Sequence, residues 1–355
     1  MRTAIKGLGF SLTLFAFLAS SASPAHAAKY KIQWLIGHVN LDYFEEAALN
    51  FKEAVEKGSH GDIEVSIVTA KDVEEYRDRR PGPEIANAVA RGEAEMGHSF
   101  TDVMGGMDPR LWAFDLPYVF RDYRHLEGVF EGPLGEELLA GLRQHKLVGL
   151  TFTYSGGANG IATEDRAIRR PEDLKGLKVG TYGDDVDQAW LTSLGATPVL
   201  INHRQENILP LARSKEIDAA VVTWRRFERA GLARTFKYVN LMDSSYLVSV
   251  TYVNEKFFES LPEDYRKLIK DSAHLAGRIE RAKTIELNEL AKRQVAAKGV
   301  RQVYLTQKNA ARFQEVLRPV YQKSLDALVG KDLIERIRKT PAGPAPLFTP
   351  DLAGR

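Results

Sequence analysis

The stretch EDYRKLIKDSAHLAGRIERAKTIELNELAKRQVAAK, residues 263–298, decides the fold. It contains 36 residues, no proline and a single glycine, Gly277. Apolar residues recur along it at roughly helical spacing, at Leu268, Ala276, Ile279, Ile285 and Leu290. At 1.5 Å per residue, one continuous helix would be about 50 Å long, more than the diameter of one small domain. We therefore expect it to run along two domains, because the alternative, a coiled coil, requires a clean heptad that this spacing lacks.

The rest of the chain alternates between strand-like and helix-like segments. The predicted strands are residues 31–36, 63–67, 95–98, 147–154, 178–181, 197–200, 218–222, 238–241, 246–253 and 300–304. The predicted helices are residues 42–57, 83–92, 133–145, 184–194, 205–214 and 306–329, the last with Thr306 as its N-cap. This alternation predicts an α/β fold with open, mostly parallel sheets. We expect a loop at the glycine-rich residues 156–160 and a flexible, proline-rich tail at 341–355.

The first 27 residues have the pattern of a secretory signal peptide. Arg2 and Lys6 supply the positive charge, residues 8–19 form an apolar run too short to cross a bilayer, and Ala25-His26-Ala27 is a small-residue cleavage site. We expect cleavage after Ala27 and a periplasmic chain of 328 residues, enough for about two domains. That chain has 47 basic and 47 acidic residues, so its charge gives no reason to expect binding to nucleic acid or to an acidic membrane. It has no second long apolar run, so we expect no direct membrane insertion.

The sequence carries no recognisable catalytic or metal-binding pattern. The absence of cysteine excludes disulfides, thiolate nucleophiles and zinc–thiolate sites. No two histidines that follow the signal peptide are two to five residues apart, as local zinc ligands would be. Ser155 does not lie in a Gly-x-Ser-x-Gly motif, because residue 153 is threonine. We therefore predict no enzymatic activity, no cofactor and no catalytic residues.

Four runs of sequence resemble one family of receptors in their order and spacing. Residues 92–97 read GEAEMG and are followed by FDLPYVFRD at 114–122. Residues 170–179 read RPEDLKGLKV, and LGATPV at 194–199 is followed by IDA at 217–219. Val253-Asn254 then precedes LPE at 261–263. Over about residues 30–300, this order resembles that of the solute-binding proteins of TRAP transporters, the tripartite secondary importers of bacteria.

The resemblance implies a two-domain periplasmic-binding-protein fold with hinge strands and a long domain-spanning helix. Domain I would hold residues 28–152 and 240–280, and domain II residues 153–239 and 281–340. The domains would close on a small molecule, an organic acid or related polar solute, and deliver it to the membrane subunits of a TRAP transporter. An ABC-type or sensory solute-binding protein is the alternative, and an exported hydrolase is a remote one.

Ligand-binding residues are expected between the two domains, where strands end. The candidates are Asn40, Tyr43, Ser99, Phe100, Tyr154, Asn159, Thr181, Tyr182, Thr223, Trp224 and Arg225. The aromatic side chains would pack on the ligand, and the Asn, Ser and Thr side chains would orient it by hydrogen bonds. Some family members hold a metal with a Glu-Trp pair, but this chain has Ala220-Val221-Val222 at that place, so we expect no metal.

The chain departs from the family pattern where a ligand-binding arginine is usual. In the family, the run that corresponds to residues 170–179 is normally followed by an arginine that binds the ligand carboxylate. In this chain the residue at that position is Gly180. A second arginine common in organic-acid receptors corresponds to Gly160 or Asn159. None of these side chains can make a bidentate charged contact. We therefore expect either that Arg225 or Arg204 supplies the cation or that the ligand is not a simple carboxylate, and that the glycines leave extra room.

Overall fold

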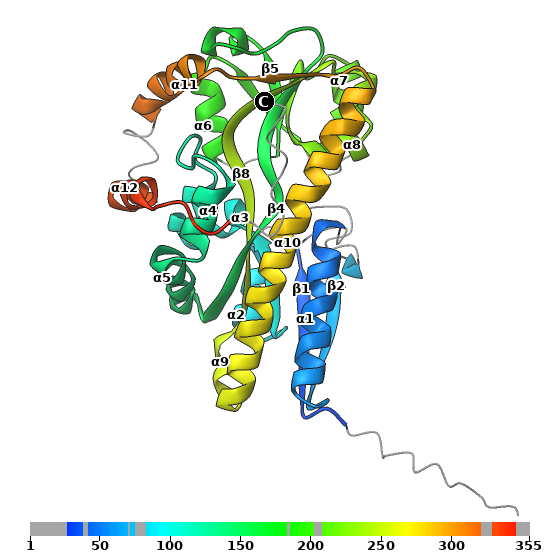
Figure 1. Cartoon of the computed structure of the whole chain (residues 1–355), viewed down its shortest axis with the longest axis vertical. Helices are drawn as coiled ribbons and strands as arrows, with labels where there is room; N and C mark the ends of the chain where they lie inside the picture. The colour runs from blue at the N-terminus through cyan, green and yellow to red at the C-terminus, as the bar shows by residue number, and fades with distance from the viewer. Residues whose placement is uncertain are drawn as a thin grey trace, which may run out of the picture.

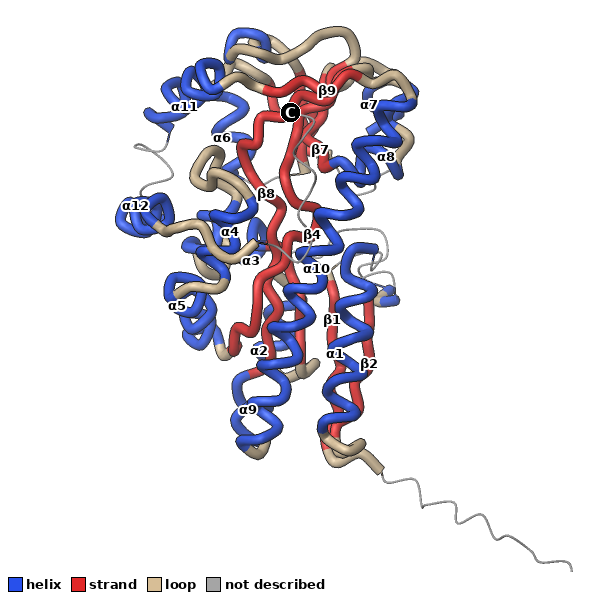
Figure 2. Tube along the Cα trace, in the orientation of Figure 1, coloured by secondary structure: helices blue, strands red, loops and turns tan. Residues whose placement is uncertain are grey.

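One continuous sheet runs through the molecule (Figures 1 and 2). The computed structural model describes residues 27–37, 42–69, 72–74, 83–182, 185–201, 208–320 and 329–345, so the predicted signal peptide lies almost entirely outside them. The sheet has nine strands in the order β2-β1-β3-β8-β4-β7-β5-β6, and β9 pairs with β8. None of the helices in the described ranges has both the length and the apolar character that a membrane span requires.

Three parallel strands form the first lobe, by which we mean these strands and the helices packed on them. The strands are β1 (Tyr30–Ile36), β2 (Ile63–Thr69) and β3 (Met96–Phe100). Helix α1 (Glu45–Gly58) packs on them through its apolar face, and α2 (Glu84–Arg91) leads into β3. The alternation of Ile32, Trp34 and Ile36 with more exposed residues places every second side chain of β1 in the core, as its pattern predicts.

Three further parallel strands form the second lobe, which is built in the same way. They are β5 (Lys178–Thr181), β6 (Thr197–Leu200) and β7 (Ala219–Thr223). The helices of this lobe are α6 (Asp185–Ser193), α7 (Ile208–Arg213) and α8 (Trp224–Arg229). In each lobe the parallel strands end on one common edge of the sheet.

Two long antiparallel strands join the lobes, which makes the sheet mixed rather than mostly parallel as predicted. β4 (Leu147–Thr163) and β8 (Tyr238–Asn254) pair along their length, β8 also pairs with β3, and β4 with β7. Both strands are longer than predicted. The expected loop at residues 156–160 is wrong, because these residues continue β4 beyond a bulge and bond to strands that are distant in sequence.

Helix α10 (Glu263–Ala297) is the predicted long helix, and it lies across both lobes in Figure 1. Ile269 and Ala273 are buried in the core of the first lobe, and Ala291 and Val295 in that of the second. The predicted helix is thus confirmed, and it serves two separate apolar cores. Of the five residues expected along its apolar side, Ala276 and Ile285 are buried, whereas Leu290 is exposed.

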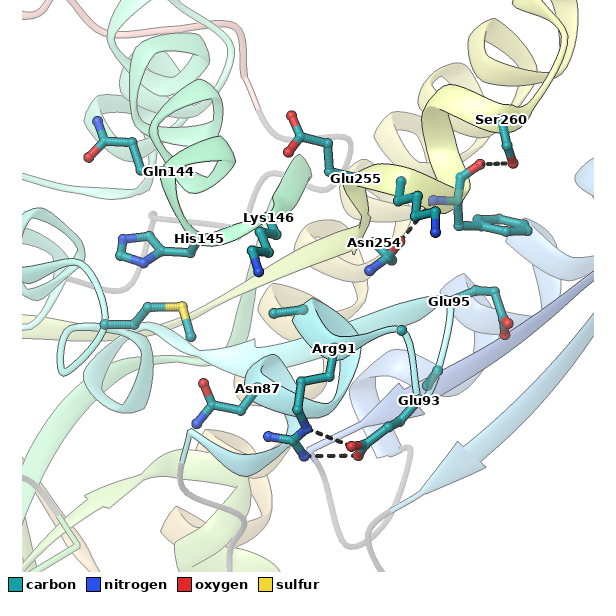
Figure 3. A pocket seen from close by; sticks show the side chains of 16 residues that line it. Asn87, Arg91, Glu93, Glu95, Gln144, His145, Lys146, Asn254, Glu255 and Ser260 are labelled. Atoms are coloured by element: carbon teal, nitrogen blue, oxygen red, sulfur yellow. Dashed lines mark hydrogen bonds and ion pairs between the residues drawn. The ribbon is translucent and has the colours of Figure 1, made fainter.

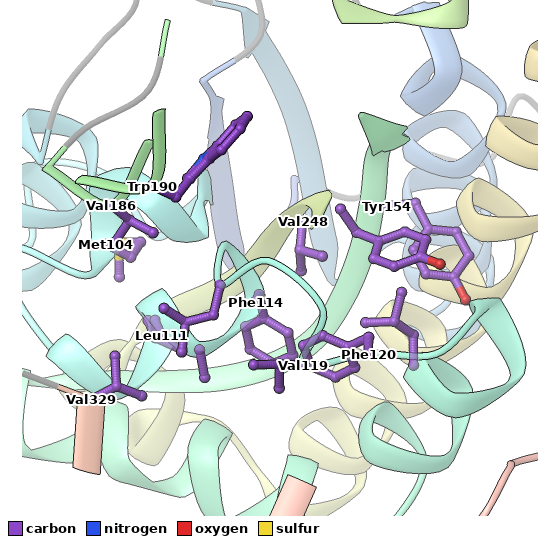
Figure 4. Packing of buried hydrophobic residues seen from close by; sticks show 14 of the residues in the cluster. Met104, Leu111, Phe114, Val119, Phe120, Tyr154, Val186, Trp190, Val248 and Val329 are labelled. Atoms are coloured by element: carbon purple, nitrogen blue, oxygen red, sulfur yellow. The ribbon is translucent and has the colours of Figure 1, made fainter. Parts of the chain in front are cut away.

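The remaining α-helices and the short helix Pro109–Phe114 cover the sheet, while β9 (Arg301–Tyr304) belongs to it and pairs with β8. These α-helices are α3 (Thr101–Met104), α4 (Tyr123–Phe130), α5 (Pro133–Gly141), α9 (Glu255–Ser260), α11 (Gln307–Val320) and α12 (Lys331–Lys339). Part of the apolar cluster beneath them is drawn in Figure 4. In this cluster the centre of the Phe114 ring lies 5.6 Å from that of Phe120 and 5.0 Å from that of Phe152 on β4.

The start of the C-terminal tail is bound to the first lobe. The Gly343 N–H donates to the Arg124 carbonyl at 2.7 Å. The Arg121 guanidinium donates to the carbonyls of Arg338 and Thr340, at 2.9 and 3.0 Å. The expectation of a flexible tail from residue 341 is therefore wrong for residues 341–343, and residues after 345 lie outside the described ranges.

Gly277 allows α10 to lie directly on β4. A Cβ atom at this position would be 2.4 Å from Thr151 Oγ1 and 3.0 Å from Thr151 Cγ2. An exposed helical Gly→Ala change would stabilise the protein by about 1 kcal/mol. Here we expect Gly277→Ala to destabilise it by about 1–3 kcal/mol, measured by urea unfolding, because the methyl group overpacks the contact.

Thr151→Ala provides the matched test of this contact. Added to Gly277→Ala, it should recover part of the lost stability, which appears as a coupling in a double-mutant cycle. A Gly277→Ala protein as stable as the wild type would contradict the close approach of helix and strand.

Candidate functional site

The two sets of parallel strands end at one cavity between the lobes. β3 ends at Phe100, while β5 and β7 end at Thr181 and Thr223. The cavity has a volume of about 50 Å³ and is lined by Phe100, Asp102, Asp115, Asn159, Tyr182, Asp187, Val221, Arg226, Ser245 and Leu247. Open α/β sheets bind ligands at the carboxyl ends of their strands. We therefore take this cavity as the candidate site.

The first lobe contributes an aromatic ring and two carboxylates. Phe100 is the last residue of β3, and Asp102 lies in the short helix that follows it. Asp102 Oδ1 accepts the Val103 N–H at 2.6 Å. The Thr101 hydroxyl lies 3.3 Å from Asp115 Oδ2 and 3.1 Å from the Val248 carbonyl. This hydroxyl thus ties Asp115, in the loop after the helix Pro109–Phe114, to the central strand β8.

A third carboxylate, Asp187, comes from the second lobe and is held by two side chains. Its Oδ2 accepts the Thr181 hydroxyl at 2.6 Å, and its Oδ1 accepts the Trp190 indole N–H at 2.9 Å. Asp187 lies in the first turn of α6, where a carboxylate also stabilises the helix dipole. The strand end and the helix together orient this carboxylate toward the cavity it lines.

Arg226 is the arginine that lines the cavity among the described residues. Its guanidinium carbon lies 4.3 Å from the centre of the Tyr182 ring, a cation–π contact. Burial raises the pKa of the Tyr182 phenol, and the positive charge of Arg226 acts in the opposite direction. The neighbouring Arg225 instead pairs with Glu228, with Nη1 and Oε2 3.0 Å apart.

The predicted site residues divide into those that line the cavity and those that do not. Phe100, Asn159 and Tyr182 line it. Thr181 and Thr223 are buried beside it; Thr181 bonds to Asp187, and Thr223 caps α8 by accepting the Arg226 N–H. Asn40 and Arg204 lie outside the described residues.

Four predicted residues belong to packed interior instead. Tyr43 and Trp224 are buried, the latter in the core of the second lobe. The Ser99 hydroxyl bonds to that of Tyr252 at 2.7 Å. Tyr154 is fully buried in the middle of β4, and its hydroxyl donates to Glu127 at 2.8 Å. The side chains of these four residues and of Arg225 do not line this cavity, and Tyr154 is not at a strand end as predicted, because β4 continues to Thr163.

The sequence reasoning missed most of the charged lining. Asp187 follows the start of a predicted helix, where a carboxylate is explained by the helix dipole alone, and its place in the cavity lining depends on the neighbouring strand end. Arg226 is one residue from the candidate Arg225. Adjacent residues in a helix point about 100° apart, so the face could be assigned only by knowing that α8 begins at Trp224.

Gly180 and Gly160, which were expected to leave extra room, do not border open space. A Cβ at Gly180 would lie 2.5 Å from Ile201 Cδ1 and 3.1 Å from Ile217 Cδ1. A Cβ at Gly160 would lie 3.1 Å from the Asn240 carbonyl oxygen. The expected extra room is therefore filled by core side chains and by β8.

A larger hollow, of about 1360 Å³, lies elsewhere on the first lobe (Figure 3). Its lining comes from α2, the residues before β3, and α9, and includes the ion pair of Arg91 with Glu93. It lies at the amino end of β3, whereas the carboxyl end is where such sheets bind ligands. Size alone therefore does not make it the candidate site.

The described residues offer no group of three or more potential metal ligands. His98, in the middle of β3, is buried, and its Nδ1 lies 2.9 Å from Thr251 Oγ1. Its ring packs 4.2 Å from that of Phe44. This histidine is a packing residue of the first lobe.

Comparisons with known proteins point to one family of receptors. The family model described as "Bacterial extracellular solute-binding protein, family 7" matches residues 38–327. The C4-dicarboxylate-binding periplasmic protein of Rhodobacter capsulatus is 25% identical over 303 residues, which cover 84% of this chain and 86% of that protein. The 2,3-diketo-L-gulonate-binding periplasmic protein of Escherichia coli is 21% identical over 283 residues, covering 78% and 81%.

Solved structures of such receptors share the fold. A TRAP periplasmic solute-binding protein from Ochrobactrum anthropi superposes with a TM-score of 0.80 at 20% identity, over 87% of this chain and 94% of that one. The sugar-acid-binding protein of Advenella mimigardefordensis, in complex with galactonate, gives a TM-score of 0.76 at 21% identity, over 89% and 98%.

Gly180 provides a test of how the second lobe is packed. We expect Gly180→Ala to lower the free energy of unfolding by about 1–3 kcal/mol, because the new methyl meets Ile201 and Ile217. Gly180→Arg should be more damaging. Shortening the neighbouring side chain with Ile201→Ala should reduce the loss of stability caused by Gly180→Ala. Chemical denaturation of the wild type, the two single variants and the double variant measures this difference. A fully stable Gly180→Arg protein would mean that this position opens into the cleft.

Proposed function

This chain belongs to family 7 of the bacterial extracellular solute-binding proteins, and on that premise we propose that it is a periplasmic receptor for a TRAP-type transporter. It captures a small organic acid between the two lobes and delivers it to the membrane subunits. We further propose that the predicted domains I and II correspond to the first and second lobes, except that α12, which was predicted in domain II, packs on the side of the first lobe through Arg121 and Glu137. The chain acts as a receptor rather than an enzyme, as its family does.

The main support for this proposal is that residues of both lobes line the cavity. Phe100, Asp102 and Asp115 come from the first lobe, and Tyr182 and Arg226 from the second. A solute that contacts both sets binds one relative orientation of the lobes best, so it shifts their equilibrium toward that orientation. The cavity of about 50 Å³ has room for only about one to three water molecules. Entry of an organic acid therefore requires the lobes to separate.

The charges of the lining favour a particular class of acid. Arg226, fixed over Tyr182, can bind one carboxylate by charge-assisted hydrogen bonds. Asp102, Asp115 and Asp187 offer hydrogen-bond acceptors for hydroxyl groups, and the described lining holds no second cation to pair with another ligand carboxylate. We propose that the solute is a monocarboxylate with several hydroxyl groups, a sugar acid rather than a dicarboxylate. Related receptors have been solved with bound galactonate, D-erythronate and β-D-glucuronate, and others with succinate.

Binding of a defined panel tests this function. Galactonate, D-erythronate, β-D-glucuronate and succinate are compared by thermal shift and isothermal titration. A true ligand at a hundredfold excess over its Kd stabilises the fold by about 2.7 kcal/mol. We expect at least one hydroxy acid to do so and succinate to bind at least tenfold more weakly. Stabilisation by succinate alone would contradict the assigned class, and no stabilisation by any of the four acids would count against it.

Adjacent arginines provide a matched pair of variants. With the hydroxy acid that binds best, Arg226→Gln should weaken affinity by about 10- to 100-fold, the value of a hydrogen bond to a charged group. Arg225→Gln should change it less than about threefold, because that guanidinium pairs with Glu228. Equal losses for both variants, or a loss confined to Arg225→Gln, would refute the assignment of Arg226.

A further inference from the structure

Strand β4 is bent at the boundary between the two lobes. Its register with β8 shifts between Thr153 and Gly157. Three consecutive residues have positive φ there, with 47° at Ser155, 144° at Gly156 and 71° at Gly157. A residue with a Cβ rarely adopts the φ of Ser155, so surrounding contacts must hold it. We call residues 154–157 the hinge bulge.

Glu280 of α10 binds the hinge bulge through two backbone amides. The Tyr154 N–H donates to Glu280 Oε2 at 2.7 Å, and the Ser155 N–H donates to Oε1 at 2.9 Å. The hydroxyl of Thr284, one helical turn along, also donates to Oε1, at 2.7 Å. Glu280 is 0% exposed. Three donors thus converge on one buried carboxylate, and only its ionised form accepts all three without placing a proton among them.

Asn288, two turns further along α10, binds the bulge from its carbonyl side. Its Nδ2 donates to the Gly156 carbonyl at 2.8 Å, and its Oδ1 accepts the Arg225 N–H of α8 at 3.3 Å. The Tyr123 hydroxyl of α4 accepts the Ala158 N–H at 3.0 Å. The backbone of the bulge and the residue after it is therefore bound by α10 and α4, and Asn288 connects it to α8 of the second lobe.

The positive charge next to Glu280, that of Arg281, is paired with two other carboxylates. The titratable groups of this cluster are Arg281 and His274 on α10, Tyr154 on β4, Tyr123 and Glu127 on α4, and Glu131 directly after α4. Arg281 Nε lies 2.9 Å from Glu127 Oε1, and the same guanidinium pairs with Glu131. Glu280 instead accepts hydrogen bonds from the hinge bulge and from Thr284. These bonds are the direct contacts that stabilise its ionised carboxylate.

We propose that Glu280 is a proton-sensitive clamp on the hinge: its ionised carboxylate holds the bulge in the bent form, and protonation loosens both the bulge and the relative orientation of the lobes. Asn288 is a second positioning residue for the same bulge. The consequence for solute capture rests on the proposed function, because a looser hinge alters uptake only if the lobes close on a solute.

The protonation step follows from the hydrogen bonds. Burial raises the pKa of Glu280, the bonds from Thr284, Tyr154 and Ser155 and the charge of Arg281 lower it, and the net pKa is about 7. A bulge that releases those amides, with the carboxyl still buried, would give Glu280 a higher pKa than the bent form does. Protons favour the state that binds them more tightly, so they favour the released bulge. The change should therefore occur near neutral pH.

Spin labels can measure the hinge directly, because the chain has no cysteine of its own. The labels are attached to Leu49→Cys on α1 and Glu315→Cys on α11, two exposed positions on opposite lobes. Distance distributions are recorded without solute between pH 8 and pH 5.5. We expect a narrow distribution at pH 8 that broadens or shifts on acidification, with its midpoint near pH 7. Glu280→Gln should show the acidic distribution at both ends of this range.

Two further variants separate the clamp from general loss of packing. Thr284→Val removes a hydroxyl donor while keeping the side-chain shape, so the midpoint should rise by about one pH unit. Ile269→Val creates a small defect in α10 within the first lobe and should leave the distribution unchanged at each pH. If Glu280→Gln does not fold, the pH dependence of the wild-type distribution and the midpoint of Thr284→Val still test the proposed clamp.

A wild-type distribution that is identical at pH 8 and pH 5.5 would overturn the clamp. So would a folded Glu280→Gln protein whose distribution matches the wild type at pH 8. No solute enters these measurements, so their outcome does not depend on the solute-binding panel. If none of the four acids binds while the spin-label distance distribution depends on pH, the proposed ligand class is rejected and the proposed role of Glu280 is retained.

Discussion

The contact between helix α10 and strand β4 is the constraint on which the rest of the structure depends. Strands β4 and β8 run through both lobes, and α10 is anchored in the core of each. Burial of one Ile or Val side chain stabilises a fold by about 1.5–3 kcal/mol, so both ends of the helix are firmly held. Relative movement of the lobes must therefore be accommodated between these ends, where Gly277, Glu280 and Asn288 approach the bent strand.

This arrangement also explains the location of the cavity. The carboxyl ends of the parallel strands in each lobe face the other lobe. A small rotation of the lobes about β4 and β8 therefore changes the distance between Phe100 and Arg226, while distances within each lobe stay nearly the same. The positioning contacts of the site are local to a lobe: Thr181 and Trp190 hold Asp187, and Tyr182 lies under Arg226. Preformed half-sites on rigid lobes suit a receptor that binds by closure.

Much of the fold followed from local patterns, and much of the site did not. Helix α10 was predictable because the absence of proline and the apolar spacing are properties of the segment itself. The run 156–160 was taken for a loop because glycine permits a loop and a bulge equally, and its pairing with β7 and β8 involves distant residues. Arg226 was missed because one residue of error in a helix start changes which side chain faces the cavity. Glu280 gave no local signal at all, since its partners Tyr154 and Ser155 lie more than 120 residues earlier.

The most direct measurement of the central claim is a crystal structure of the chain with a bound hydroxy acid. The account predicts that the acid lies between the lobes, with its carboxylate on the Arg226 guanidinium and its hydroxyls on the aspartates of both lobes. A solute bound in the hollow beside Arg91 and Glu255, or a carboxylate held between the lobes by a different cation, would contradict it.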